Sequence, residues 1–231
     1  MAASETALIV GTGPGLSASL ARRFAAEDIK VAIASRNTDK LTDLVGETGA
    51  KPYACDASDP ASVADLFKSV TADLGEPDIV VYNASNRARG PIVDLDPEAV
   101  LTAIKISCFG GFLVAQQAAK QMVPRGNGAI FLTGASAGVK GFPNSSSFAM
   151  GKFGLRGLAQ SLARELHPQN VHVGHFVIDG GIGRNNDPRR DRGPEGLLNP
   201  DSIAETYYSF WRQPRDAWAW EIELRPWVEK F

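Results

Sequence analysis

The stretch LIVGTGPGLSASLARRFA, residues 8–25, decides the fold because its character changes at a cluster of glycines. Its first three residues are aliphatic and are typical of a buried strand, whereas LSASLARRFA carries apolar residues at helical spacing. Gly11, Gly13 and Gly15 lie between them and allow both a tight turn and a close approach of a ligand to the backbone. A strand, a glycine turn and a helix in this order predict the start of a dinucleotide-binding domain.

The alternation of strand and helix patterns continues along the chain. Further strands are predicted by KVAIAS ending at Ser35, KPYAC at Cys55, DIVVYN at Asn83, GAIFLTG at Gly134, VHVGHFVI at Ile178 and AWAWEIEL at Leu224. Helical patterns separate them, and one of these runs without interruption over residues 97–123. This alternation predicts an α/β, doubly wound parallel sheet in one domain, residues 1–231. Residues 183–201 are polar and rich in Gly, Pro and Arg, so we expect a mobile substrate loop there.

The composition is that of an ordinary globular protein. The 231 residues are 44% hydrophobic and carry a formal net charge of -2, which argues against a nucleic-acid partner. We expect a cytoplasmic protein without a membrane partner, because the first residues do not form a signal peptide and no apolar run is expected to reach membrane-spanning length. Cys55 and Cys108 lack metal-ligand spacing, so free thiols and no metal site are expected.

Polar residues follow the second, third and fourth predicted strands, where a dinucleotide would lie. Arg36 stands where an acidic residue usually holds the ribose of NAD, and its guanidinium would pair with the 2′-phosphate of NADP(H). A solvated loop arginine is the alternative for Arg36, and turn chemistry is the alternative for the others. The predicted cofactor-binding residues are Gly11, Gly13, Pro14, Gly15, Leu16, Ser35, Arg36, Asn37, Asp56, Ala57, Asn83, Ala84, Ser85, Lys152 and Ile182.

Together these motifs resemble the short-chain dehydrogenase/reductase family. GTGPGLS is similar to the family's glycine turn, with Ser17 in place of the last glycine, and YNAS is similar to its Asn-Asn-Ala-Gly motif. The resemblance covers nearly the whole chain. It implies a Rossmann-type fold with a seven-stranded parallel sheet and helices on both faces. It also implies a nicotinamide cofactor and a homodimer or homotetramer packed through two long helices.

The catalytic set implied by the resemblance is incomplete in this chain. The family's Tyr-x-x-x-Lys corresponds to Phe148 and Lys152, its serine to Ala135 and its helix asparagine to Ser107. The tyrosine would protonate the substrate oxygen and the serine would bond to it, so an ordinary alcohol dehydrogenase mechanism is not expected. The lysine would still hold the nicotinamide ribose. Ser136 is a candidate to orient a carbonyl group, although helix capping or loop solvation is the more common role of a serine there.

Three functions remain open. The first is an NADP(H)-dependent oxidoreductase that reduces an activated C=C bond or a conjugated carbonyl of an apolar or conjugated small molecule, since a stabilised enolate can take its proton from water. The second is a catalytically inactive sensor of NADP(H), or a partner subunit of an active enzyme. The third is a non-redox reaction such as elimination. It ranks last because this chain keeps the glycine turn that relatives with such activity tend to lose.

Overall fold

The computed structural model describes residues 4–183, 193 and 195–229. Most of the predicted loop at about 183–201, with its expected mobility, therefore lies outside the described residues. Its last two positions belong to helix α7, which begins at Pro200 and ends at Trp211.

The seven strands form one parallel sheet in the order β3-β2-β1-β4-β5-β6-β7, which confirms the predicted Rossmann-type fold. Each described strand runs parallel to its neighbours, so all carboxyl ends meet at one edge of the sheet. The strands are β1 Thr6–Val10, β2 Lys30–Ser35, β3 Lys51–Ala54, β4 Ile79–Tyr82, β5 Ala129–Thr133, β6 His172–Ile178 and β7 Glu221–Leu224.

Strand β7 is shorter than the sequence predicts, because AWAW lies outside it. Trp218 instead stacks on His172, with the ring centroids 4.5 Å apart, and its indole N–H donates to the carbonyl of Gln213. The side-chain amide oxygen of Gln213 also accepts from the backbone N–H of Ala219 at 3.0 Å. These contacts fix residues 213–219 before the strand, and the carbonyl of Trp220 reaches β6, where it accepts from the backbone N–H of His175 at 2.7 Å.

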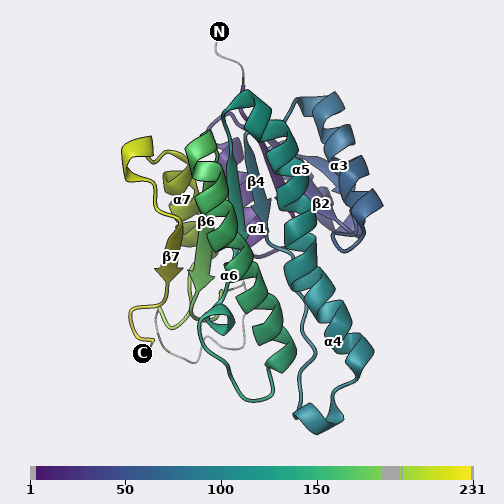
Figure 1. The fold of residues 1–231 in the computed structure, drawn as a ribbon. Helices are drawn as coiled ribbons and strands as arrows, with labels where there is room; N and C mark the ends of the chain where they lie inside the picture. Colours follow the sequence, from purple (N-terminus) through teal and green to yellow (C-terminus); the bar gives the residue numbers. More distant parts are fainter. Residues whose placement is uncertain (1–3, 184–192, 194, 230–231) are drawn as a thin grey trace.

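Helices cover both faces of the sheet, as expected for central strands that are buried at every position. On one face Leu8 and Val10 pack with α3 Pro60–Leu74, α5 Gly110–Arg125 and α6 Ser146–Leu166. This is the face toward the viewer in Figure 1. On the other face Ala7 and Ile9 pack with α1 Leu16–Ala25, α2 Thr42–Thr48 and α7. Two hydrophobic cores thus hold the carboxyl edge of the sheet in a fixed shape.

The long helix predicted over residues 97–123 is interrupted. It consists of α4 Pro97–Ile104, a π-helical turn Lys105–Phe109 and α5, and the N–H of Gly110 bonds to the carbonyl of Lys105 five residues earlier. α4 projects beyond the sheet (Figure 1). Within the run Pro97–Arg125, an 18-residue window has a mean hydropathy of 1.6, which meets the length and composition of a membrane span, so the prediction that no apolar run is that long was wrong. Core helices meet the same criterion, and α5 buries Leu113 and Val114 against the sheet.

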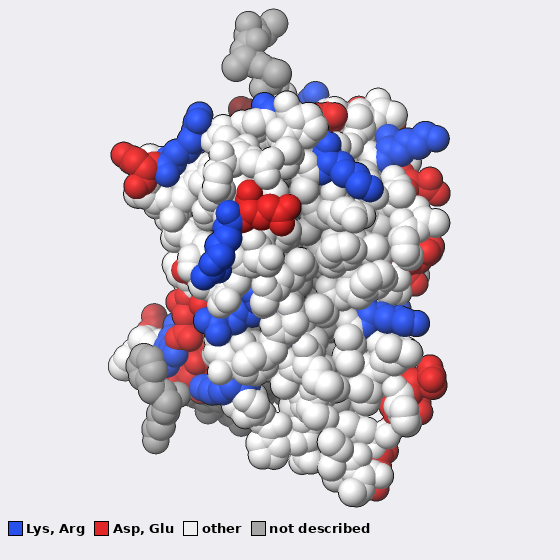
Figure 2. Space-filling model, viewed as in Figure 1, with Lys and Arg blue, Asp and Glu red and all other residues white. Residues whose placement is uncertain are grey.

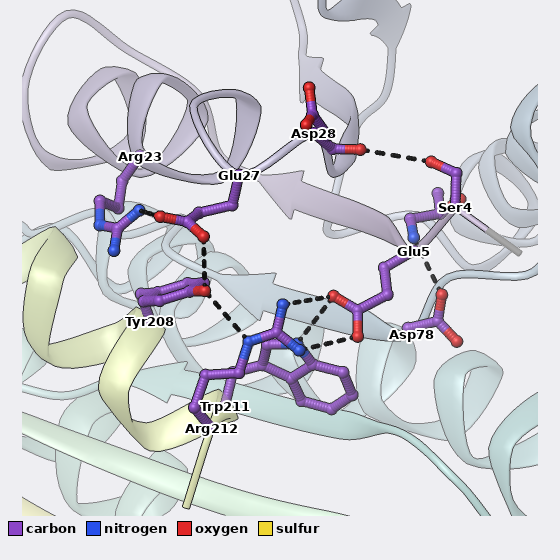
Figure 3. Close-up of polar contacts among 10 residues, drawn as sticks. Ser4, Glu5, Arg23, Glu27, Asp28, Asp78, Tyr208, Trp211 and Arg212 are labelled. Atoms are coloured by element: carbon purple, nitrogen blue, oxygen red, sulfur yellow. Dashed lines mark hydrogen bonds and ion pairs between the residues drawn. The ribbon is translucent and has the colours of Figure 1, made fainter. Parts of the chain in front are cut away.

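Polar contacts fasten α7 to the start of the sheet (Figure 3). The guanidinium of Arg212 donates to both carboxylate oxygens of Glu5, each at 2.8 Å, and the hydroxyl of Tyr208 donates to Glu27 at 2.7 Å. The Arg212–Glu5 ion pair is partly exposed, so it contributes about 1 kcal/mol or less. Both contacts keep α7 beside α1, at whose N-terminus the glycine turn lies.

Candidate active site

The glycine turn joins β1 to α1 and leaves an open space beside its backbone. Gly11 has φ +90°, and a Cβ there would lie 2.4 Å from the backbone nitrogen of Ala84, so only glycine fits. A Cβ on Gly13 or Gly15 would meet nothing within 4 Å. Among the described residues no side chain caps α1, and no acidic residue lies in its first turn, so the first N–H groups of the helix and its positive dipole end are available to a phosphate. These residues fit a dinucleotide.

Ser17 ties the glycine turn to the neighbouring strand. Its hydroxyl donates to the carbonyl of Gly11 at 3.0 Å and accepts from the amide of Asn83 at 2.6 Å. Asn83 directly follows β4, so the turn and the end of β4 move as one unit. The serine that replaces the family's last glycine thus has a structural contact that the sequence alone did not indicate.

A smaller pocket of about 270 Å³ lies over the ends of β2, β3 and β4. Of the predicted residues, Gly11, Ser35, Arg36, Asp56, Ala57, Asn83, Ala84 and Ser85 line it. Hydrogen bonds from Ser58 lower the pKa of the Asp56 carboxyl, and the nearby charge of Arg36 adds to the effect. Asn37 does not line the pocket. Its side-chain oxygen instead accepts from the N–H of Asp39 at 2.9 Å and closes the turn after β2.

A larger pocket of about 530 Å³ continues from the smaller one and shares Gly11, Asn83 and Ser85 with it. It brings the glycine turn together with the residues predicted at the substrate end. Of the predicted residues, Gly11, Gly13, Pro14, Gly15, Leu16, Asn83, Ser85, Ala135, Ser136, Phe148, Lys152 and Ile182 line it. Ser136 opens a short 3₁₀ turn after β5, and its hydroxyl makes no hydrogen bond within the described part of the chain.

Lys152 lies at the floor of the larger pocket and is almost fully buried. Its ammonium donates to the carbonyl of Thr133, the last residue of β5, at 2.6 Å. Burial, together with the positive charge of Arg87, lowers the pKa of Lys152 from 10.5 to about 8. The lysine is thus held in place but keeps donors for a ligand in the pocket.

Arg87 is a pocket residue that the sequence analysis missed. It follows the YNAS motif by two residues and lines the larger pocket. Its guanidinium carbon lies 4.0 Å from the centroid of the Phe148 ring, and the Lys152 nitrogen lies 5.8 Å from the same centroid. Two cations therefore flank the aromatic ring that stands in the tyrosine position.

Ser107 is not a pocket residue, in contrast to its prediction as part of the catalytic set. It lies fully buried in the π-helical turn, where its hydroxyl accepts from the N–H of Asn86 at 3.0 Å and donates to the carbonyl of Asn86 at 2.9 Å. Ser147 makes the same pair of bonds to Ala88, at 3.0 and 2.7 Å. The two serines fix the backbone on both sides of Arg87.

Two other titratable groups near the sheet point away from the pocket. The Tyr82 hydroxyl donates to the carbonyl of Ile106, and burial raises its pKa. His175 is fully buried, its Nδ1 lies 2.8 Å from a carboxylate oxygen of Glu221, and burial lowers its pKa. Neither group is placed to move a proton in the larger pocket.

Known proteins share this combination of fold and site. The family model described as short chain dehydrogenase matches residues 5–182, so the chain belongs to the short-chain dehydrogenase family. Its relatives include reductases and dehydrogenases.

Among the relatives, the short-chain dehydrogenase/reductase eriH of Hericium erinaceus is 33% identical over 187 residues, which are 77% of this chain and 74% of eriH. A solved short-chain dehydrogenase from Rhodopseudomonas palustris is 31% identical, with a TM-score of 0.84 over 96% of this chain and 99% of its own. The fold is also shared with an actinorhodin polyketide ketoreductase solved with NADPH, with a TM-score of 0.88, 22% identity and 96% of each chain covered.

Proposed function

We propose that this protein is an NADP(H)-dependent oxidoreductase with a non-standard active site, which reduces an activated C=C bond or a conjugated carbonyl. The observation that carries the proposal is the division of the larger pocket. Its cofactor end keeps the glycine turn and Lys152, whereas Phe148 and Ala135 carry no proton donor at the substrate end.

The choice of NADP(H) over NAD(H) is supported by Arg36. It lines the smaller pocket at the end of β2, where a guanidinium can pair with a 2′-phosphate. Solved structures of the same fold hold NADPH or NADP. When bound, the reduced cofactor would supply hydride to a carbon of the substrate.

The chain's own residues then bind and shield the substrate. Phe148 is buried but lines the pocket, and it offers a flat apolar surface to a conjugated molecule. General acid catalysis contributes roughly 10²- to 10⁴-fold, and without it the reduction of a plain ketone is disfavoured. An enolate formed from an enone needs no acid in the pocket, because it takes its proton from water after the hydride has arrived.

The test follows the absorbance of NADPH with two matched substrates, cyclohexenone and cyclohexanone. We expect consumption with the enone and much slower consumption with the saturated ketone. Equal rates would contradict the role given to Phe148. The missing donors also favour a second candidate, an inactive NADP(H) sensor or partner subunit, which predicts tight NADPH binding and no consumption with any substrate.

The proposed partner is a second copy of the chain, in a homodimer or homotetramer. Support comes from large apolar side chains that are exposed on α4, the π-helical turn, α5 and α6: Leu101, Phe109, Phe112, Met150 and Phe153. Figure 2 shows a broad area with few charges over these helices. We propose no nucleic-acid or membrane partner and a cytoplasmic location, which the two free cysteines support.

A further inference from the structure

The larger pocket is positively charged around Phe148. Arg87 and Lys152 both line it, and no Asp or Glu does so among the described residues. Within the described part of the chain, the guanidinium of Arg87 has no hydrogen-bond acceptor and no carboxylate partner. Its donors are thus available to a ligand.

Hydrogen bonds hold the backbone on both sides of Arg87. Ser107 and Ser147 are both fully buried, and each uses its hydroxyl twice, as donor and as acceptor, on a residue next to Arg87. Burying a hydroxyl costs desolvation free energy, which its hydrogen bonds must offset. Here those hydrogen bonds go to the loop backbone and hold it in place. The backbone of Arg87 is therefore anchored from α6 and from the π-helical turn.

The side chain is oriented by Phe148. A guanidinium carbon 4.0 Å from the ring centroid lies against the ring face, in a cation–π contact. A stacked guanidinium keeps its N–H donors at the edge of its plane, where they match the two oxygens of a carboxylate. Lys152 lies on the same ring and adds to the positive field.

We propose that Arg87, supported by Phe148 and Lys152, forms an anion-binding subsite that selects flat conjugated substrates carrying a carboxylate. This inference rests on the proposed function and names its substrate class. The carboxylate would be held by the edge of the Arg87 guanidinium while the conjugated part of the substrate lies along Phe148.

The test measures binding, not turnover, of two inert probes to the protein saturated with NADP. Cinnamate and cinnamamide have nearly the same shape, and only cinnamate is charged. Calorimetry should show cinnamate binding at least about tenfold more tightly, which corresponds to about 1.4 kcal/mol. Arg87→Gln should remove this preference. Arg89→Gln is the matched control, because Arg89 is an exposed arginine of the same loop, as Arg87 is, but does not line the pocket.

The affinity for NADP in each variant separates the outcomes. Unchanged NADP affinity together with a lost cinnamate preference in Arg87→Gln alone supports the subsite. Equal binding of both probes by the unmodified protein, or an equal loss in Arg89→Gln, would overturn it. A loss of NADP affinity in Arg87→Gln would also overturn it, since the arginine would then serve a cofactor phosphate. A failure of the proposed function is distinguishable from these outcomes. In that case no NADPH is consumed, but the protein still binds cinnamate more tightly than cinnamamide.

Discussion

Replacing Lys152 with methionine should stabilise the cofactor-free protein, although it removes a residue of the site. Burial lowers the lysine pKa from 10.5 to about 8. A shift of that size means that holding the charged form inside the fold costs about 3 kcal/mol at pH 7. Loss of the hydrogen bond to the Thr133 carbonyl offsets about 1 kcal/mol of this. Lys152→Met should therefore raise the free energy of unfolding by about 2 kcal/mol at pH 7.

The pH dependence identifies the cause. Between pH 8 and 10.5 the unfolded chain holds a proton on this lysine that the folded chain has released, so the stability of the unmodified protein rises with pH across that window. From pH 7 to pH 9.5 the unmodified protein should gain about 2 kcal/mol relative to Lys152→Met, and the advantage of the variant should nearly vanish. Groups common to both proteins cancel in this difference.

Urea unfolding of both proteins at pH 7 and pH 9.5, without cofactor and at equal protein concentration, measures these quantities. Stability differences that are the same at both pH values would refute the reasoning, because Lys152 would then have an ordinary pKa in the fold. Calorimetry on the same samples should show weaker NADP binding by Lys152→Met. If Lys152→Met is more stable but binds NADP less tightly, Lys152 serves cofactor binding and not the stability of the fold.

Three further predictions concern the cofactor, the chemistry and the assembly. Calorimetry should show NADP binding at least about tenfold tighter than NAD, and Arg36→Asp should remove or reverse this preference; equal affinities in the unmodified protein would contradict the assignment. Phe148→Tyr combined with Ala135→Ser should gain ketone reduction beyond the sum of the single changes, since both groups act on one oxygen, and additive rates would argue against that pairing. Phe153→Glu should yield a smaller species in light scattering than the unmodified protein. Phe142→Glu should not, because Phe142 is 43% exposed, close to the 45% of Phe153, but lies outside α4–α6. An unmodified protein that is monomeric would disprove the proposed assembly.

The sheet was predictable because its signals are local. The glycine turn and the apolar runs bounded by polar residues are contained within a few positions each, and Gly11 and Lys152 lie where their motifs imply. The π-helical turn was not predictable in this way. It contains Ser107, which pairs with Asn86, 21 residues away, and helical periodicity carries no trace of such a contact.

Arg87 was missed for the same reason. An arginine in a loop after a strand carries no sequence signal for a pocket, and the contacts that hold this loop come from Ser107 and Ser147, which are distant in sequence. Ser147 contacts Ala88 across 59 positions of sequence. The end of the C-terminal strand was placed correctly at Leu224, but its start was not, because Trp218 is held by stacking on His172 rather than by its own strand propensity.

The π-helical turn also sets the phase of one helix relative to another. It accommodates one more residue than an α-helical turn, and each residue of an α-helix advances the chain by about 100°. Deleting a single residue from Lys105–Phe109 would therefore leave a continuous helix while rotating α4 by about that angle against α5. Ser107 would no longer face Asn86, and the apolar side chains of α4 would turn to a different side. Deleting one residue would thus change both the loop that carries Arg87 and the apolar surface of α4. Homologues that differ in length by one residue in this turn should differ in that loop and in that surface.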